Sequence, residues 1–326
     1  MEGAKRKVCV TGASGFIGLR LVESLLDGGH CVRVLTRGLR EVKPHGTEVV
    51  IGDLTSSDCP LASFLKGCEL LFHCAGEIHN SEVMELLHVE GTSRLIEAVK
   101  REVEHSGEPI HVVHLSSCGA YGPPPAGVRS DRFVTEDSAI RPTSIYEVTK
   151  AKSDEIVAEG CQGDGLTYSI LRPSNVVGVA IANHPLERMV RLVKSGKFFF
   201  LGKAGAITTF VHVDDVVSAL VRLSKEEGAC GDVYNLSSDC SLESLIDEIA
   251  DCLNVPMPRL RFPVFVVRWP LIIAAALLKK LIHVPVLDSL VIRTRYPSEK
   301  IESELGFKFS KPFPCAVTEL IDEWKV

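Results

Sequence analysis

Apolar and polar positions in the first half of the chain follow two alternating periods. Short runs rich in β-branched residues lie at 7–12, 30–37, 47–54, 69–76, 110–117 and 167–173. Between them, apolar residues recur every three to four positions at 16–29, 60–65, 81–103 and 144–160. The first pattern is typical of strands and the second of amphipathic helices. This alternation predicts right-handed crossovers and a parallel sheet covered on both faces, a doubly wound Rossmann-type α/β fold.

The pattern changes after Pro173. The next predicted elements are a helix at 184–196, a short strand at 198–202 and a strand followed by a helix at 210–225. From Ser241 onward, helical segments and prolines indicate a smaller cap. We therefore expect a Rossmann domain of residues 1–173 and 208–238, and a smaller C-terminal substrate-binding subdomain of residues 174–207 and 239–326.

The composition is that of a globular protein, with 45% hydrophobic and 24% charged residues. A formal net charge of −6 and a pI near 6.0 leave no basic footprint, so we expect no nucleic-acid partner. The 11 cysteines are scattered and odd in number, and none forms a CxxC pair. Free thiols in a reducing cytoplasm are expected rather than disulfides or zinc.

Two segments bear on a membrane partner. The N-terminal "MEGAKRK" is basic, but no apolar signal region follows it. The longest uncharged apolar run, at 269–278, is about half of the ~20 residues that a spanning helix needs. We expect a buried cap helix there, with an interfacial anchor as the alternative. A cytoplasmic protein without a membrane partner is the prediction.

A glycine-rich turn joins the first predicted strand to the first helix. Gly12, Gly15 and Gly18 are spaced G-x-x-G-x-x-G in "TGASGFIG". Glycine lets the backbone approach a pyrophosphate, whose charge the exposed N–H groups and the helix dipole stabilise. A tight turn without a ligand is the alternative. The strand before and the helix after favour dinucleotide binding.

Tyr146 and Lys150 lie four positions apart in a predicted helix and so share one face. Ser117 ends the preceding strand, so a hydroxyl, a phenol and an ammonium converge at the carboxyl edge of the sheet. Hydride transfer to or from an alcohol requires a proton transfer as well. A free phenol titrates near 10, and a neighbouring cation favours phenolate. The pair is therefore predicted to be a catalytic acid/base rather than an ordinary surface pair.

Together these motifs resemble the extended short-chain dehydrogenase/reductase family, in its NAD-dependent epimerase/dehydratase branch. The other matching motifs are "GDL" (52–54), "HCAG" (73–76), "LSSCGAYG" (115–122), "LRPSNVVG" (171–178) and "FVHVDDV" (210–216). The resemblance implies an NAD(P)-dependent enzyme with Ser117, Tyr146 and Lys150 as catalytic residues. The implied cofactor-binding residues are Gly12, Ser14, Gly15, Phe16, Ile17, Gly18, Arg37, Asp53, Leu54, Ala75, Gly76, Tyr146, Lys150 and Pro173.

Two of these positions have specific implied roles. Asp53 would receive the adenine amino group, although an Asp here can also cap the following turn. Arg37 stands at the end of the second strand, where strictly NAD-using members of the family carry an acid. An arginine can hold a 2′-phosphate through paired, charge-assisted hydrogen bonds, whereas a solvated strand-end charge is the alternative. Arg37 therefore favours NADP, with NAD left open.

The resemblance also implies a substrate class. Asn175 matches the Asn that contacts the diphosphate of a nucleotide sugar, and residues 196–202 match the strand along the nucleoside. Family members of this kind usually carry Arg-Asp before "FVHVDD", where this chain has Thr208 and Thr209. An arginine at 293 or 295 is the candidate replacement. The main hypothesis is a nucleotide-sugar 4-epimerase whose substrate contacts Ser117, Cys118, Asn175 and Arg295.

Two alternatives remain at this point. One is an NADP-dependent carbonyl reductase that resembles the dihydroflavonol and hydroxysteroid enzymes, favoured by Arg37 and the apolar cap at 262–282. The other is a non-catalytic cofactor sensor, which has no need of the Ser117–Tyr146–Lys150 set. Dehydration is disfavoured, because Cys118 and Gly119 replace the required acids.

Assembly and metal binding complete the expectations. The helices at 82–103 and 144–160 flank one sheet face and in this family form a two-fold dimer interface, so a homodimer is expected. Asp214 and Asp215 lie at a strand-to-helix junction, where one of them is expected to be the N-cap. We expect no metal site.

Overall fold

The computed structural model describes residues 6–38, 46–125, 130–163, 165–179, 185–266 and 291–324. Its centre is a seven-stranded sheet in the order β11-β7-β5-β4-β1-β2-β3. All its neighbouring strands are parallel, which confirms the predicted Rossmann-type fold. The strands are β1 (Lys7–Thr11), β2 (Cys31–Thr36), β3 (Glu48–Ile51), β4 (Leu70–His73), β5 (Ile110–Leu115), β7 (Leu166–Pro173) and β11 (Asp232–Leu236).

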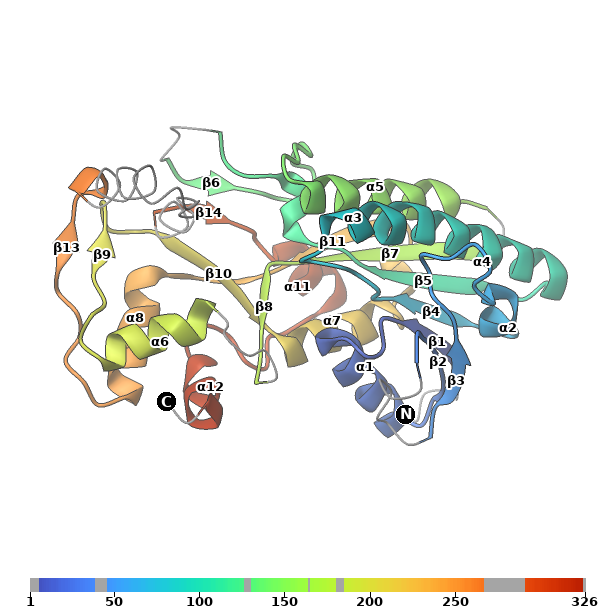
Figure 1. Ribbon diagram of the computed structural model, residues 1–326, viewed down its shortest axis with the longest axis horizontal. Helices are drawn as coiled ribbons and strands as arrows, with labels where there is room; N and C mark the ends of the chain where they lie inside the picture. The colour runs from blue at the N-terminus through green and yellow to red at the C-terminus, as the bar shows by residue number, and fades with distance from the viewer. Residues whose placement is uncertain are drawn as a thin grey trace.

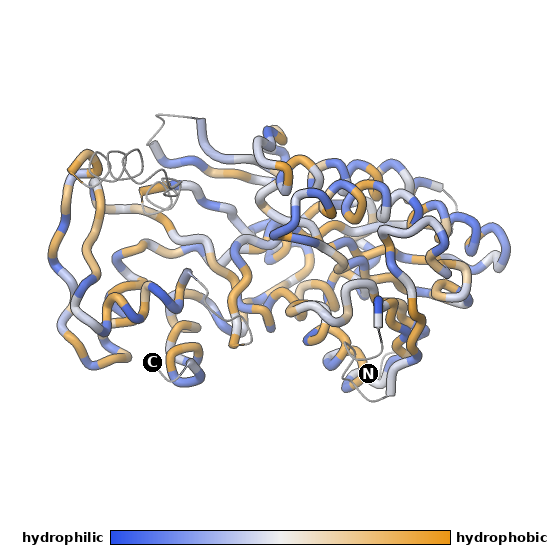
Figure 2. The backbone as a smooth tube through the Cα atoms, in the orientation of Figure 1, coloured by the Kyte–Doolittle hydropathy of each residue, from blue (hydrophilic) through white to orange (hydrophobic). Residues whose placement is uncertain are grey.

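Helices cover both faces of this sheet, as Figure 1 shows. One face packs against α1 (Phe16–Asp27), α7 (Val213–Leu223) and α11 (Glu299–Leu305). The other face packs against α2 (Leu61–Leu65), α4 (Thr92–Ser106) and α5 (Ile145–Gly160). The central strands read as hydrophobic in Figure 2, as expected for a sheet that is buried on both faces. All seven carboxyl ends therefore meet at one edge, where a site can form.

The helix predicted at 81–103 is divided into three segments. It begins as α3 (Ser81–Met84), continues as a π-helical stretch (Glu85–Gly91) and ends as α4. A π-helical stretch inside an α-helix changes the direction of the side chains that it carries and is frequent at functional sites. The stretch carries His88, which is buried against α5.

A second, smaller part of the molecule forms the cap. Its sheet has the order β12-β10-β8, made of β12 (Ser238–Ser241), β10 (Ile207–His212) and β8 (Asn175–Val177). The helices α6 (Pro185–Lys194), α8 (Leu242–Cys252) and α12 (Val317–Trp324) share a separate hydrophobic core with it. Four further strands have two residues each and form two parallel pairs. β9 (Phe200–Leu201) pairs with β13 (Arg261–Phe262), and β6 (Arg132–Phe133) pairs with β14 (Thr294–Arg295).

The expected division of the chain differs from this packing in two places. β10 pairs with β8 and β12, so residues 207–212 belong to the cap sheet and not to the large one. α11 instead packs on the core of the large sheet, through Ile301 and Leu305. The sequence pattern of α11 suits a helix on the core of the cap as well as on the core of the large sheet. Its location therefore depends on tertiary packing alone.

The expected N-cap at Asp214 or Asp215 is wrong. α7 is capped by His212, whose Nδ1 accepts the N–H of Asp214 at 3.2 Å. Asp215 instead accepts hydrogen bonds from the backbone of Ser310 and Lys311. Among the described residues, His212, Asp214 and Glu319 form a group of metal-ligating types. The Lys311 ammonium already bonds Asp214 at 2.8 Å and Glu319 at 2.6 Å.

Within the described part of the chain, no helix has the length and apolar character to cross a membrane. The apolar run at 269–278, expected to be a cap helix, lies outside the described residues. The proposed apolar cap at 262–282 falls outside them for the most part as well.

Candidate active site

The glycine turn after β1 has the close backbone contacts that a pyrophosphate cradle needs. Gly12 has φ +71°, and a Cβ added there would lie 2.6 Å from the backbone nitrogen of Ala75. A Cβ at Gly18 would lie 2.0 Å from the carbonyl oxygen of Gly12. Any larger residue at either position must push the turn away from its neighbours. The N-terminus of α1 follows directly, capped by Gly15, and its free N–H groups suit an anion.

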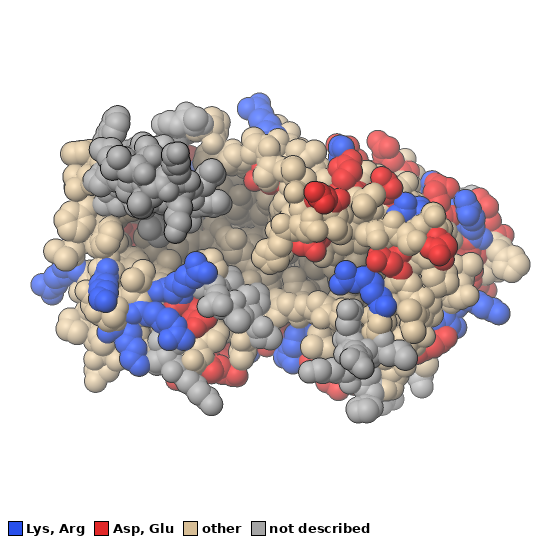
Figure 3. Space-filling view, viewed as in Figure 1, with Lys and Arg blue, Asp and Glu red and all other residues tan. Residues whose placement is uncertain are grey.

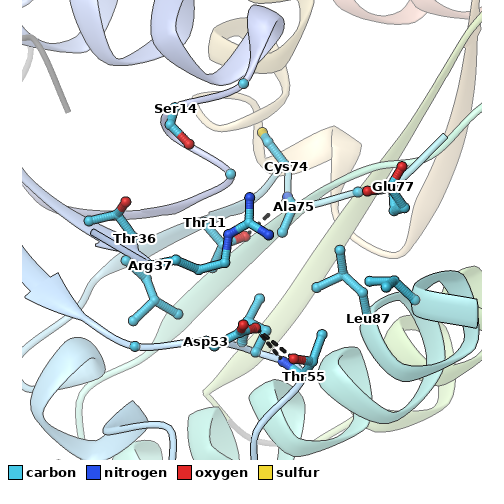
Figure 4. A pocket seen from close by; sticks show the side chains of 17 residues that line it. Thr11, Ser14, Thr36, Arg37, Asp53, Thr55, Cys74, Ala75, Glu77 and Leu87 are labelled. Atoms are coloured by element: carbon cyan, nitrogen blue, oxygen red, sulfur yellow. Dashed lines mark hydrogen bonds between the residues drawn. The ribbon is translucent and has the colours of Figure 1, made fainter. Parts of the chain in front are cut away.

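A pocket of about 190 Å³ opens at this turn (Figure 4). The predicted cofactor residues that line it are Gly12, Ser14, Gly15, Arg37, Asp53, Leu54, Ala75 and Gly76. Residues that also line it and that sequence reasoning missed are Thr11, Leu35, Thr36, Gly52, Thr55, Cys74, Glu77, Val83 and Leu87. Most of these directly precede or follow a predicted residue at a strand end, and that position is the signal that could have found them.

Arg37 and Asp53 stand on neighbouring strand ends of this pocket. The Arg37 side chain is exposed and, in Figure 4, extends between Ser14 and Asp53. Asp53 Oδ1 accepts hydrogen bonds from the backbone and the hydroxyl of Thr55, at 2.9 and 2.8 Å. The turn-capping alternative for Asp53 is therefore present, together with its place in the pocket wall.

Six predicted cofactor residues do not line this pocket: Tyr146 and Lys150, which lie on α5, and four others at the turn and on β7. The ring of Phe16 faces Gly178, where an added Cβ would lie 2.7 Å from its Cζ. Ile17 packs against the hydrophobic core, and Gly18 is buried beneath the turn. Pro173 is buried at the end of β7, where it pairs with Leu236. These last four residues shape the turn and the sheet behind the pocket.

The predicted catalytic hydroxyls meet where β5 ends and α5 begins. Ser117 follows β5, and its Oγ accepts the Gly119 N–H at 3.0 Å. A Cβ added at Gly119 would lie 3.3 Å from Ser117 Oγ and 3.5 Å from Tyr146 Cε1, so both side chains border this glycine. The Ser117 hydroxyl also acts to lower the pKa of the neighbouring Tyr146 phenol. The structure brings these two predicted residues together.

Lys150 is fully buried one turn further along α5. Its Nζ donates to the carbonyl oxygen of Leu115 at 2.7 Å. Burial lowers the pKa of Lys150, and the nearby Asp154 carboxylate opposes that effect.

The expected lowering of the Tyr146 pKa by Lys150 is not found. Burial raises the pKa of Tyr146, and only the neighbouring Ser117 hydroxyl opposes the rise. The physical reason is that the ammonium is directed to the Leu115 carbonyl. Tyr146 is therefore held as a neutral phenol, the form that donates a proton.

The buried His88 side chain positions α5 beneath the site, and the sequence analysis did not identify this residue. His88 Nε2 accepts the Glu77 N–H at 2.9 Å, so its Nδ1 carries the proton and donates to Thr149 Oγ1 at 2.8 Å. Thr149 in turn donates to the carbonyl oxygen of Tyr146 at 3.2 Å. Burial lowers the pKa of His88 to about 3, so the ring stays neutral.

A buried ion pair lies one further turn along α5. Asp154 Oδ2 accepts from Arg172 Nε at 2.9 Å, with both side chains less than a tenth exposed. The His114 ring lies 3.4 Å from the other carboxylate oxygen. Tyr146, Lys150 and Asp154 thus follow one another on the buried side of the helix, at the four-residue spacing that places them on one face.

A second pocket, of about 370 Å³, opens beside the catalytic hydroxyls between the large domain and the cap. Gly119 and Glu147 line it next to Ser117 and Tyr146. The cap contributes mainly apolar and hydroxyl side chains: Met189, Ile207, Thr208, Thr209, Phe210, Leu242, Ile292, Thr294 and Tyr296. In Figure 3 the hollow between the two parts is mostly uncharged, and Lys and Arg project from the outer surface of the cap.

The predicted substrate residues differ in how they relate to this pocket. Asn175 lines it, but its Nδ2 already donates to the carbonyl and hydroxyl oxygens of Thr209, at 3.0 and 3.1 Å. Cys118 is only 2% exposed and donates to the Arg172 carbonyl, so its placement in a substrate site is wrong. Sequence alone does not reveal that the turn after Ser117 points this thiol inward.

The expected cation from the C-terminal segment is not in the pocket either. Thr294 and Tyr296 line it, and Arg295 between them does not, because successive residues of a strand point to opposite sides. Arg293 bonds Asp131 at 2.6 Å and the Ala204 carbonyl at 3.0 Å. Among the described residues that line this pocket there is no lysine or arginine.

Gly18→Ala is expected to weaken NADPH binding at least tenfold, because the new methyl group collides with the Gly12 carbonyl and displaces the turn. Overpacking of this kind costs roughly 1–3 kcal/mol. Gly228→Ala is the matched control, since an added Cβ there meets nothing within 4 Å. Fluorescence titration measures both. Unchanged affinity in a folded Gly18→Ala protein would contradict the role of the turn.

Comparison with known proteins adds the family. The sequence model of the NAD dependent epimerase/dehydratase family matches residues 8–237. Sterol demethylase protein B of Methylococcus capsulatus is 30% identical over 268 residues, which cover 78% of this chain and 76% of that protein. UDP-glucose 4-epimerase of Mycolicibacterium smegmatis is 30% identical over 277 residues, covering 77% and 83% respectively.

A solved structure shows the same fold. MoeE5 in complex with UDP-glucose and NAD has a TM-score of 0.71 over 98% of both chains, at 24% identity. The family match spans more than half of the chain and includes the glycine turn, Ser117, Tyr146 and Lys150. The protein is therefore an enzyme of the NAD-dependent epimerase/dehydratase family, a group of short-chain dehydrogenase/reductase oxidoreductases.

Proposed function

We propose that this enzyme is an NADP-dependent reductase of an uncharged ketone. The observation that carries the proposal is the pocket beside Ser117 and Tyr146, in which no described lining residue is a lysine or arginine. A diphosphate buried there would lack a cationic partner, and burying an unpaired charge is costly. Apolar walls and hydroxyl groups suit a neutral substrate instead.

The chemistry follows from the hydroxyls at the end of the pocket. When bound, a reduced nicotinamide supplies the hydride that the carbonyl carbon accepts. Tyr146 donates its phenolic proton to the carbonyl oxygen, and the raised pKa of Tyr146 keeps that proton available. Ser117, which borders Gly119 together with Tyr146, orients the same oxygen. Lys150, buried one turn further along α5, would help to hold the cofactor beside Tyr146.

The cofactor residues fit a dinucleotide, because Gly12 and Gly18 form a cradle that a Cβ would fill. Arg37 supports NADP over NAD, since its exposed side chain lines the pocket and extends into it in Figure 4. Asp53, Leu54 and Ala75 would line the remainder of that site.

NADPH is expected to bind more tightly than NADH, and Arg37→Ala is expected to remove most of the difference. The loss should be roughly 1.5–3 kcal/mol, the usual contribution of a hydrogen bond to a charged group. Arg101→Ala on the exposed face of α4 is the matched control for removal of a positive charge. Titration of the apo-protein with both cofactors measures this. Equal wild-type affinities would refute the role of Arg37.

A second candidate is the nucleotide-sugar 4-epimerase. Asn175 supports it, because its side chain lines the pocket at the position expected to contact a diphosphate. The resemblance to UDP-glucose 4-epimerase supports it as well. For this function the amide of Asn175 would have to exchange its bonds to Thr209 for bonds to phosphate.

One pair of experiments decides between the candidates. Calorimetric titration with UDP and UDP-glucose is expected to show no binding, while a panel of neutral ketones is expected to support NADPH oxidation. Micromolar binding of UDP-glucose that weakens on Asn175→Ala, without ketone-dependent NADPH oxidation, would replace the reductase by the epimerase.

A further inference from the structure

We infer that Glu147 selects substrates by charge: its carboxylate excludes anionic ketones from the pocket and admits neutral ones. The inference rests on the proposed reductase function and names the residue that gives the site its preference. Glu147 directly follows Tyr146 and is the one charged residue among the described residues that line the substrate pocket.

The position of Glu147 is fixed by the start of α5. Its Oε2 accepts hydrogen bonds from the backbone N–H groups of Thr143 and Ser144, at 2.8 and 3.0 Å, and from the Thr143 hydroxyl at 3.0 Å. This is the acidic half of a capping box, which holds the side chain in one conformation. The hydrogen bonds found among the described residues leave Oε1 without a partner. One oxygen therefore anchors the carboxylate, and the other is available to the pocket.

The carboxylate also lies close to the reacting groups. A Cβ added at Gly119 would lie 3.7 Å from Glu147 Cγ and 3.3 Å from Ser117 Oγ, so one glycine separates them. Tyr296 shares the pocket, and burial together with nearby negative groups, Glu147 among them, raises the pKa of its hydroxyl. The charge of Glu147 thus acts within the pocket.

The consequence for a substrate follows from Coulomb's law. Two negative charges several ångströms apart in a partly desolvated site repel one another far more than in water. No described lysine or arginine lines the pocket. Arg132 lies behind the wall, where its guanidinium donates to the carbonyl oxygens of Gly122 and Tyr121, and so offsets only part of the repulsion. A ketone that carries a carboxylate or phosphate next to its carbonyl is therefore disfavoured, and its uncharged analogue is not.

The test uses two probes of nearly equal shape, 2-oxo-4-phenylbutanamide and 2-oxo-4-phenylbutanoate. The wild-type holoenzyme is expected to show a higher kcat/KM for the amide. Glu147→Gln is expected to raise the acid-to-amide ratio of kcat/KM by roughly tenfold, since the repulsion is removed. Glutamine keeps an acceptor for the capping box, so the helix start is preserved.

Glu155→Gln is the matched control. It makes the same change in net charge on the exposed side of α5 and is expected to leave the ratio unchanged. Added salt gives a second measurement that needs no variant. It is expected to raise the ratio in the wild type by screening the repulsion, and to leave it flat in Glu147→Gln.

The possible outcomes distinguish a failure of the Glu147 inference from a failure of the reductase proposal. A ratio that Glu147→Gln leaves unchanged, with the amide still reduced, overturns the role of Glu147 and keeps the reductase. An equal rise of the acid-to-amide ratio in Glu155→Gln overturns the role of Glu147 as well, because the ratio then depends on the net charge of the protein. If the wild type reduces neither this amide nor any neutral ketone, the reductase proposal fails and the inference falls with it.

Discussion

A Tyr146→Phe variant is expected to lose roughly a hundredfold or more in turnover while it binds cofactor almost as tightly as the wild type. The size is that of a lost general acid. The substitution removes only the hydroxyl, and the ring keeps its packing against the His88 ring, whose centroid lies 6.0 Å away. Steady-state reduction of a neutral ketone measures the loss, and titration with NADPH checks binding.

Tyr168→Phe on β7 controls for the removal of a phenolic hydroxyl outside the site. The hydrogen bonds found in the described part of the chain include none made by the Tyr168 hydroxyl, so its loss should change neither turnover nor binding. Wild-type turnover in Tyr146→Phe would show that another group donates the proton.

Asp154→Asn is expected to lower the free energy of unfolding by about 3–5 kcal/mol, because it leaves the charge of Arg172 buried without its partner. Both side chains are less than a tenth exposed, and the bond between them is 2.9 Å long. Chemical denaturation measures the change. Glu155→Gln, next to it on the exposed side of the helix, should differ from the wild type by less than about 0.5 kcal/mol. A loss below 1 kcal/mol in Asp154→Asn would contradict the importance of the pair.

The Asp154–Arg172 pair also makes the stability of the fold depend on pH. Burial acts to raise the pKa of Asp154, but His114 and Arg172 outweigh it and hold that pKa below its usual value of 3.8. A carboxyl whose pKa is lowered on folding stabilises the fold above its unfolded pKa and loses that contribution as the pH falls through the folded value. Wild-type stability should therefore fall more steeply than that of Asp154→Asn below about pH 4.

The parts of the site that the sequence predicts are those set by local geometry. A glycine between strand and helix, and two residues four apart on one helix, have nearly fixed positions once the elements are known. Gly12, Tyr146 and Ser117 accordingly lie where the pattern places them.

The parts that escaped prediction depend on contacts between distant segments. The pattern of 81–103 indicates one helix, and only packing against α5 accounts for the π-helical stretch that carries His88. β11 joins the large sheet as its seventh strand through pairing with β7, which no local signal reveals. Arg295 was a reasonable candidate by charge, but the register of a two-residue strand directs it away from the pocket. The place of Glu147 in the pocket wall likewise has no local signal, because it depends on the cap segments that line the other side of the pocket.

The central claim is that this site transfers hydride to a neutral carbonyl while Tyr146 protonates the oxygen. Its most direct test is reduction of 2-oxo-4-phenylbutanamide with NADPH that carries deuterium at both C4 positions, followed by mass spectrometry of the product. We expect an alcohol with one deuterium on the former carbonyl carbon, formed by the wild type and nearly absent with Tyr146→Phe. An unlabelled alcohol, or no alcohol from any neutral ketone, would contradict it.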